Sequence, residues 1–129
     1  MAQPAASDDY KVLLVEDDSA VAEMCKLGLE LNGYTVVVAP DGETGLYLAK
    51  QFRPDVIVLD IALPGMNGLA LLDKMRAEPQ LRAIPTLILT NHDDPDIHKR
   101  AVELGALKFL AKSKTTADSL AGWVRRPNG

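Results

Sequence analysis

Short apolar segments recur along the chain, and each is followed by a longer segment with helical periodicity. The first, residues 11–15, contains four consecutive aliphatic residues and ends abruptly at Glu16, Asp17 and Asp18. Continuous apolar runs of this length are typical of strands buried on both faces of a parallel sheet. The same pattern predicts four further strands, at residues 34–39, 55–59, 84–89 and 107–111.

The segments between the predicted strands have the start and stop signals of helices. Asp41 and Asp94 are expected to cap two of them, and two others are predicted after residue 68 and from about residue 116. The first helix is expected to begin at a Ser19 cap and to end at Gly33. We expect its buried face to carry Ala20, Met24, Leu27 and Leu31.

Strands that alternate with helices at this spacing predict an α/β domain. Its sheet should be parallel, covered by helices on both faces and joined by right-handed crossovers. The chain of 129 residues has the size of one such domain. We expect a loose N-terminal tail at residues 1–9, the folded domain over residues 10–126 and a short tail at residues 127–129.

Composition and charge narrow the class of protein. A hydrophobic fraction of 47% with 25% charged residues is typical of a globular domain, and the net charge of −4 argues against a nucleic-acid binder. Cys25 is the one cysteine, which excludes an internal disulfide and fits a reducing compartment. The chain has no apolar run long enough to span a bilayer. We therefore expect a cytoplasmic protein that contacts neither membrane nor nucleic acid directly.

Polar residues follow four of the five predicted strands, at the sheet edge where open α/β sheets bind ligands. Three carboxylates side by side need a compensating cation, and oxygen ligands suit Mg²⁺ or Mn²⁺. A hydroxyl and an ammonium beside them are suited to bind phosphoryl oxygens. The set predicts phosphoryl transfer to an aspartate, with Asp60 as the nucleophile. Its members are Glu16, Asp17, Asp60, Thr90 and Lys112.

Together these residues resemble the response-regulator receiver domains of two-component signalling, the CheY-like family. The match includes the acidic pair after the first strand, Asp60 within DVIVLDIALPGMNG, Thr90 after the fourth strand and Lys112 after the fifth. Phe109 lies where the family has its switch aromatic. The resemblance extends over roughly residues 10–125 and implies a flavodoxin-like strand order of 2-1-3-4-5.

The resemblance also implies a role for each residue of the site. Asp60 would accept a phosphoryl group from a phosphohistidine of a histidine kinase or a histidine phosphotransfer protein. Asp17 would be the main metal ligand, with Glu16 acting partly through water and the backbone carbonyl of Ala62 completing the set. Thr90 and Phe109 would form the switch. The fourth helix, fifth strand and fifth helix, roughly residues 94–126, would then contact a downstream protein target, and a homodimer through this face is compatible with the resemblance.

Two positions depart from related patterns. Lys112 is followed by Ser113, where receivers usually have a proline in a cis peptide bond. We expect a trans bond here, because non-proline cis bonds cost about 2.5–4 kcal/mol. With a trans bond, the loop that carries Lys112 is expected to be placed differently from that of other receivers. A degenerate receiver that binds proteins without phosphorylation is therefore the alternative function.

Aspartate-nucleophile phosphatases place a second carboxylate where this chain has Ala62, so turnover catalysis beyond slow autodephosphorylation is not expected.

Overall fold

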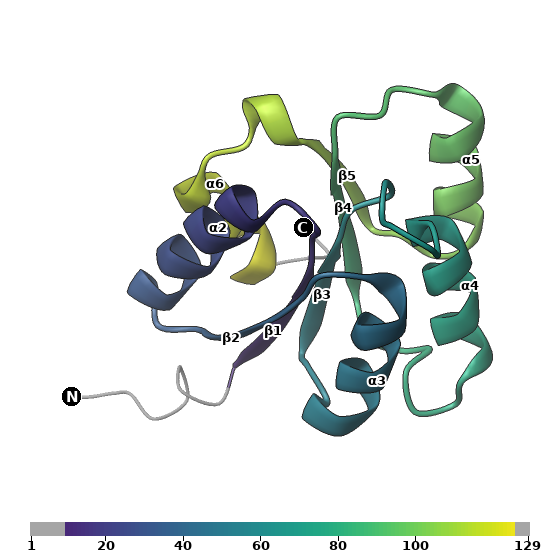
Figure 1. Ribbon diagram of the computed structural model, residues 1–129, viewed down its shortest axis with the longest axis horizontal. Helices are drawn as coiled ribbons and strands as arrows, with labels where there is room; N and C mark the ends of the chain where they lie inside the picture. The colour runs from purple at the N-terminus through teal and green to yellow at the C-terminus, as the bar shows by residue number, and fades with distance from the viewer. Residues whose placement is uncertain (1–9, 126–129) are drawn as a thin grey trace.

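The structure, a computed structural model, describes residues 10–125 and contains one parallel sheet in the order β2-β1-β3-β4-β5 (Figure 1). The predicted tails at residues 1–9 and 127–129 lie outside the described residues. The predicted α/β class and strand order are confirmed, and each predicted strand lies within two residues of its observed bounds. The strands are β1 (Lys11–Val15), β2 (Thr35–Ala39), β3 (Val56–Leu59), β4 (Thr86–Thr90) and β5 (Lys108–Ala111).

Helices cover both faces of the sheet (Figure 1). On one face lie α2 (Ser19–Leu31) and α6 (Ala117–Arg125), and on the other lie α3 (Gly42–Phe52), α4 (Gly68–Ala77) and α5 (Pro95–Glu103). A single 3₁₀ turn, η1 (Lys112–Lys114), follows β5 directly. Among the described helices, none combines the length and the apolar character needed to cross a membrane.

The core has two parts because side chains alternate between the faces of a strand. Val12 and Leu14 of β1 join the buried cluster beneath α2 and α6, whereas Leu13 and Val15 join the cluster beneath α3, α4 and α5. All four are at most 1% exposed. This explains why the β1 segment is apolar at every position, since neither face of the strand meets solvent.

The register of the central strands determines which polar residues lie level with one another at the carboxyl edge of the sheet. Val15 of β1 is paired with Leu59 of β3, so Glu16 and Asp60 follow at the same level. The backbone N–H of Asp60 donates to the Val15 carbonyl at 3.0 Å, which extends this pairing by one residue. Thr90 of β4 is paired with Ala111 of β5, the residue before Lys112. The expected edge of polar side chains therefore follows from the strand pairing itself.

Helix α2 corrects two expectations from the sequence. Its cap is Asp18, whose carboxylate accepts from the N–H groups of Ala20 and Val21 at 3.0 and 3.2 Å, and Ser19 is the first helical residue. The predicted buried face was wrong: Met24, Leu27 and Leu31 are 53%, 59% and 78% exposed, and Ala20 is exposed as well. The residues that α2 buries are Ala22, Cys25 and Leu29.

Packing against α6 explains which face of α2 turns inward. A side chain at Gly28 would collide with the Cβ of Ala117, so this glycine lets the two helices approach closely. Gly28 and Leu29 follow Cys25 by three and four residues, so both are neighbours of Cys25 on the helix surface. The close approach therefore turns this side of α2 toward the sheet and α6, and leaves Met24, Leu27 and Leu31 outside.

Candidate functional site

Three carboxylates converge at the carboxyl ends of β1 and β3. One oxygen from each of Glu16, Asp17 and Asp60 lies within 4.8 Å of the others. Glu16 and Asp60 are 2% and 4% exposed, whereas Asp17 is exposed at the start of α2. Asp18, the fourth acidic residue of this region, is engaged as the α2 cap. The three predicted acidic residues thus lie together in the structure, whereas Asp18 caps α2.

Lys112 reaches across this acidic cluster from the η1 turn. Its Nζ donates to Asp60 Oδ2 at 2.7 Å and lies 2.7 Å from Glu16 Oε1. Burial lowers the pKa of Lys112, but its hydrogen bond to Asp60 and the negative charges of Asp60 and Glu16 outweigh burial and leave this pKa above its usual value. Lys112 is therefore a stable ammonium that bridges the two buried carboxylates.

Glu16 is the most enclosed acid of the cluster, with a side chain that is 1% exposed. Burial raises its pKa above the usual value, and the repulsion from Asp60 adds to this effect. Lys112 and the backbone N–H of Asp18, which donates to Glu16 Oε2 at 3.0 Å, act in the opposite direction on this pKa. The partners close to Glu16 thus oppose the effect of burial on its pKa.

The donor set of the cluster fits a hard divalent cation. Three carboxylates and one ammonium carry a formal charge of −3 + 1 = −2, which a divalent ion would balance. All the candidate ligand atoms are oxygens, the type that Mg²⁺ and Mn²⁺ prefer. Ala62 lies beside the cluster, since its N–H donates to Asp60 Oδ1 at 3.2 Å. The ligand role of its carbonyl stays a prediction.

Thr90 lies at the end of β4 and is 2% exposed. Its Oγ1 accepts from the backbone N–H of His92 at 3.3 Å, and no acceptor for its hydroxyl proton is found within residues 10–125. Phe109 pairs with Ile88, two residues before Thr90, so Phe109 and Thr90 project to the same face of the sheet. Both line a cavity of about 510 Å³ that opens beside them.

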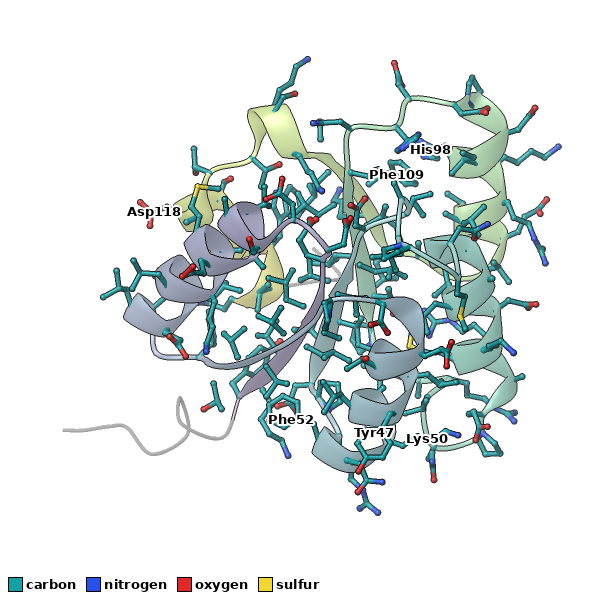
Figure 2. All side chains as sticks on the ribbon, in the orientation of Figure 1. Tyr47, Lys50, Phe52, His98, Phe109 and Asp118 are labelled. Carbon is teal, nitrogen blue, oxygen red and sulfur yellow. The ribbon has the colours of Figure 1, made fainter. Side chains whose placement is uncertain are left out.

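The ring of Phe109 is half-buried and stacks on His98 of α5 (Figure 2). The ring centroids are 4.4 Å apart and the planes differ by 10°. The predicted switch aromatic is thus partly exposed: it packs against the core cluster beneath α3, α4 and α5 and lies over the exposed His98. Nothing in the sequence pattern indicated this partner, because His98 lies on a different element, eleven residues before Phe109.

The peptide bonds of residues 10–125 are all trans, so the predicted trans bond between Lys112 and Ser113 is confirmed. The Ser113 N–H donates to the side-chain oxygen of Asn91 at 2.9 Å. Asn91 was not among the site residues predicted from the sequence. The available signal was Ser113 itself, because a residue in the usual place of proline brings an additional N–H donor that needs an acceptor.

The fold and this edge of the sheet define a CheY-like domain: a doubly wound parallel sheet with an acidic cluster and a lysine at its carboxyl edge. A family model described as the response regulator receiver domain matches residues 12–121. The chain belongs to this family. Receiver domains are signalling switches of two-component systems and are not turnover enzymes.

Related proteins and structures agree with this assignment. The transcriptional regulatory protein HprR of Escherichia coli is 37% identical over 111 residues, which cover 86% of this chain and 48% of HprR. The chain thus spans about half the length of the curated relatives it matches. Chemotaxis protein CheY4 of Vibrio cholerae matches with a TM-score of 0.83 and 31% identity over 90% of this chain and 96% of CheY4. The Mn²⁺-bound form of response regulator Rcp1 matches with a TM-score of 0.78 and 25% identity, over 88% of this chain and 91% of that one.

Proposed function

We propose that Asp60 is the phosphoacceptor of a signalling switch and receives its phosphoryl group from a phosphohistidine of a histidine kinase or histidine phosphotransfer protein. The observation that carries this proposal is the buried bridge from Lys112 to Asp60 and Glu16. Such a bridge holds a cation where the charge of a transferring phosphoryl group would develop. The proposal places the protein in the cytoplasm, with the folded domain over residues 10–126.

In the proposed reaction a carboxylate oxygen of Asp60 bonds to phosphorus while the phosphorus–nitrogen bond of the donor breaks. The bonding electron pair leaves on the imidazole nitrogen, and Asp60 becomes an acyl phosphate. Glu16, Asp17, Asp60 and the Ala62 carbonyl would hold Mg²⁺ or Mn²⁺, which supplies Lewis-acid stabilisation of phosphoryl oxygens. The ammonium of Lys112 and the hydroxyl of Thr90 would donate to the same oxygens.

A phosphoryl group on Asp60 would then shift the conformation of the domain. Thr90 would leave the His92 N–H to bind the phosphoryl group, and Phe109 would turn inward along the same face of the sheet. Charge-assisted hydrogen bonds contribute about 1.5–3 kcal/mol each. Changing a mostly inactive population into a mostly active one requires about 5.5 kcal/mol. The donors Thr90 and Lys112 together with a bound metal are of the right order to achieve this shift.

The surface that would change is formed by α5, β5 and α6, within residues 94–126. Phe109 lies in this surface, and Val102 and Leu107 beside it are 56% and 41% exposed. Exposed apolar side chains next to a moving ring favour recognition by another protein. We propose a downstream protein target here, or a second copy of the chain, without direct contact to nucleic acid or membrane.

Asp60→Asn is expected to abolish phosphorylation, because an amide oxygen cannot form the acyl phosphate. The measurement is intact-protein mass after incubation with Mg²⁺ and a small acyl-phosphate donor. The parent protein should gain the mass of one phosphoryl group and the variant should gain none.

Asp93→Asn is the matched control for this variant, since Asp93 is an exposed aspartate in the loop after β4. It should gain the phosphoryl group as the parent does. If the parent gains no mass while an authentic receiver reacts in parallel, the phosphoacceptor proposal is wrong and a degenerate binding module is the better description.

His98→Ala is expected to increase the rate of phosphorylation by about two- to tenfold, because an aromatic pair contributes about 0.5–1.5 kcal/mol beyond the area it buries. Without its stacked partner the Phe109 ring is less stable in its observed position, so the state coupled to phosphorylation, in which the ring turns further inward, becomes more populated. The measurement is the rate of adduct formation at fixed donor concentration. His98→Phe keeps a flat ring at this position and should react at the parental rate. Equal rates in all three proteins would show that the stack does not restrain Phe109.

A further inference from the structure

Two loops at the carboxyl edge of the sheet are joined by one side-chain hydrogen bond. Asn91, in the loop between β4 and α5, accepts through Oδ1 from the backbone N–H of Ser113 at 2.9 Å. Asn91 directly follows Thr90, and Ser113 directly follows Lys112. The bond therefore links the residues adjacent to the two side chains that are proposed to bind phosphoryl oxygens.

The bond satisfies a donor that has no other partner in its turn. Ser113 lies in the first turn of η1, where backbone N–H groups lack intrahelical acceptors, and the residue before the turn, Ala111, makes no side-chain cap. The β4–β5 ladder ends at the pair Thr90 and Ala111, so Asn91 extends the contact between these strands by its side chain. A proline at position 113 could not take part, because it has no N–H.

Other contacts hold the two loops on either side of this bond. Thr115 donates its hydroxyl proton to the Ala111 carbonyl at 2.7 Å, which closes the η1 turn behind Lys112. On the other loop, the His92 N–H donates to Thr90 Oγ1 at 3.3 Å. The Asn91 bond is the direct link between these two locally closed loops among the hydrogen bonds of the described residues.

We propose that Asn91 is a positioning residue for phosphoryl transfer: through the Ser113 N–H it fixes the turn that carries Lys112 relative to Thr90. The proposal rests on the proposed function of Asp60. Small errors in the placement of reacting and stabilising groups cost large factors in rate, so a single bond that sets the spacing of two donors affects the reaction. In this chain the bond fixes the loop after Lys112. A proline at position 113 could not form this bond, because it has no N–H.

Asn91→Ala is expected to slow phosphorylation of Asp60 by about three- to tenfold, the effect of losing one hydrogen bond. The measurement is the rate of mass gain with Mg²⁺ and a small acyl-phosphate donor. Both residues are exposed, so the thermal midpoint should stay within about 2 °C of the parent. A role limited to stability would show the opposite pattern, with a lower thermal midpoint and an unchanged rate.

Two substitutions at the partner residue separate the bond from other effects of Asn91. Ser113→Ala keeps the backbone N–H and should leave the rate unchanged, whereas Ser113→Pro removes it and should slow the reaction as Asn91→Ala does. The double variant, Asn91→Ala with Ser113→Pro, should be no slower than Ser113→Pro alone, because both changes break the same bond. In the unphosphorylated protein, Asn91→Ala should also speed hydrogen exchange at the Ser113 amide, observed by NMR.

The outcomes distinguish this inference from the proposal on which it rests. If the parent gains no phosphoryl group, the function proposed for Asp60 fails and the positioning role fails with it. If the parent is phosphorylated but Asn91→Ala reacts at the parental rate, the positioning role alone is overturned. Additive slowing in the double variant overturns it as well, because Asn91 would then act by a route other than the Ser113 N–H.

Discussion

Lys112→Met is expected to slow phosphoryl transfer to Asp60 by about a hundredfold, the typical effect of removing one group that stabilises transition-state charge. The same substitution should lower the free energy of unfolding at neutral pH by about 3 kcal/mol, because it leaves a buried carboxylate without its cation. Both effects have one cause: Lys112 Nζ is 2.7 Å from an oxygen of Asp60 and of Glu16.

The loss of stability should depend on pH in a defined direction. Burial already raises the pKa of Glu16 in the folded parent, and removing Lys112 raises it further, since Lys112 lowers this pKa. A carboxyl group whose folded pKa exceeds its unfolded pKa adds stability at pH values below the unfolded pKa. This stability is lost as the pH rises through the folded pKa. Lys112→Met should therefore be least stable relative to the parent at neutral pH and regain part of the difference on acidification.

Urea unfolding at several pH values measures the stability difference, and the rate of mass gain measures the transfer. Lys114→Met is the matched control, because Lys114 is an exposed lysine in the same turn. It should keep the parental stability and phosphorylation rate. Equal stability of the Lys112 and Lys114 variants at neutral pH would contradict a stabilising role of the buried bridge. Equal phosphorylation rates would remove Lys112 from the proposed mechanism.

The placement of the acidic cluster could be predicted from the sequence for a simple physical reason. The carboxyl ends of parallel strands meet at one edge of the sheet, so a carboxylate that ends one strand approaches a carboxylate that ends its neighbour. The register that pairs Val15 with Leu59 turns this general rule into contact between Glu16 and Asp60. The roles of these residues in phosphoryl transfer stay predictions.

The features that the sequence did not reveal depend on contacts between distant segments. Helix α2 has apolar residues around most of its circumference, so its periodicity fits more than one buried face. Which face of α2 is buried depends on the close approach of Gly28 to Ala117 of α6, two residues that lie far apart in the chain. The partners of Phe109 and Ser113 were missed for the same reason, because each lies on another loop or helix.

Gly68→Ala is expected to displace Asp60, the proposed phosphoacceptor. A Cβ at Gly68 would collide with the carbonyl oxygen of Asp60 and would lie 2.7 Å from the Cα of Ile61. Both contacts are with backbone, which cannot move aside as the end of a flexible side chain can. Gly68 also holds this loop directly, since its N–H donates to the Ile61 carbonyl at 2.7 Å. The segment that carries Asp60 must therefore shift.

We expect this shift to lower the free energy of unfolding by about 1–3 kcal/mol, as other overpacked substitutions do. Phosphorylation should slow by about a hundredfold, because a displacement of about 1 Å at a reacting group has that effect. Gly122→Ala is the matched control: a Cβ there has no atom within 4 Å, so it should leave the rate unchanged and stabilise α6 by about 0.5–1 kcal/mol. If Gly68→Ala kept the parental stability and rate, the contact between Gly68 and the Asp60 backbone would not restrict the position of the acceptor. If it lost rate without losing stability, the loop would have moved at little cost, and the precise placement of Asp60 would be the property that Gly68 protects.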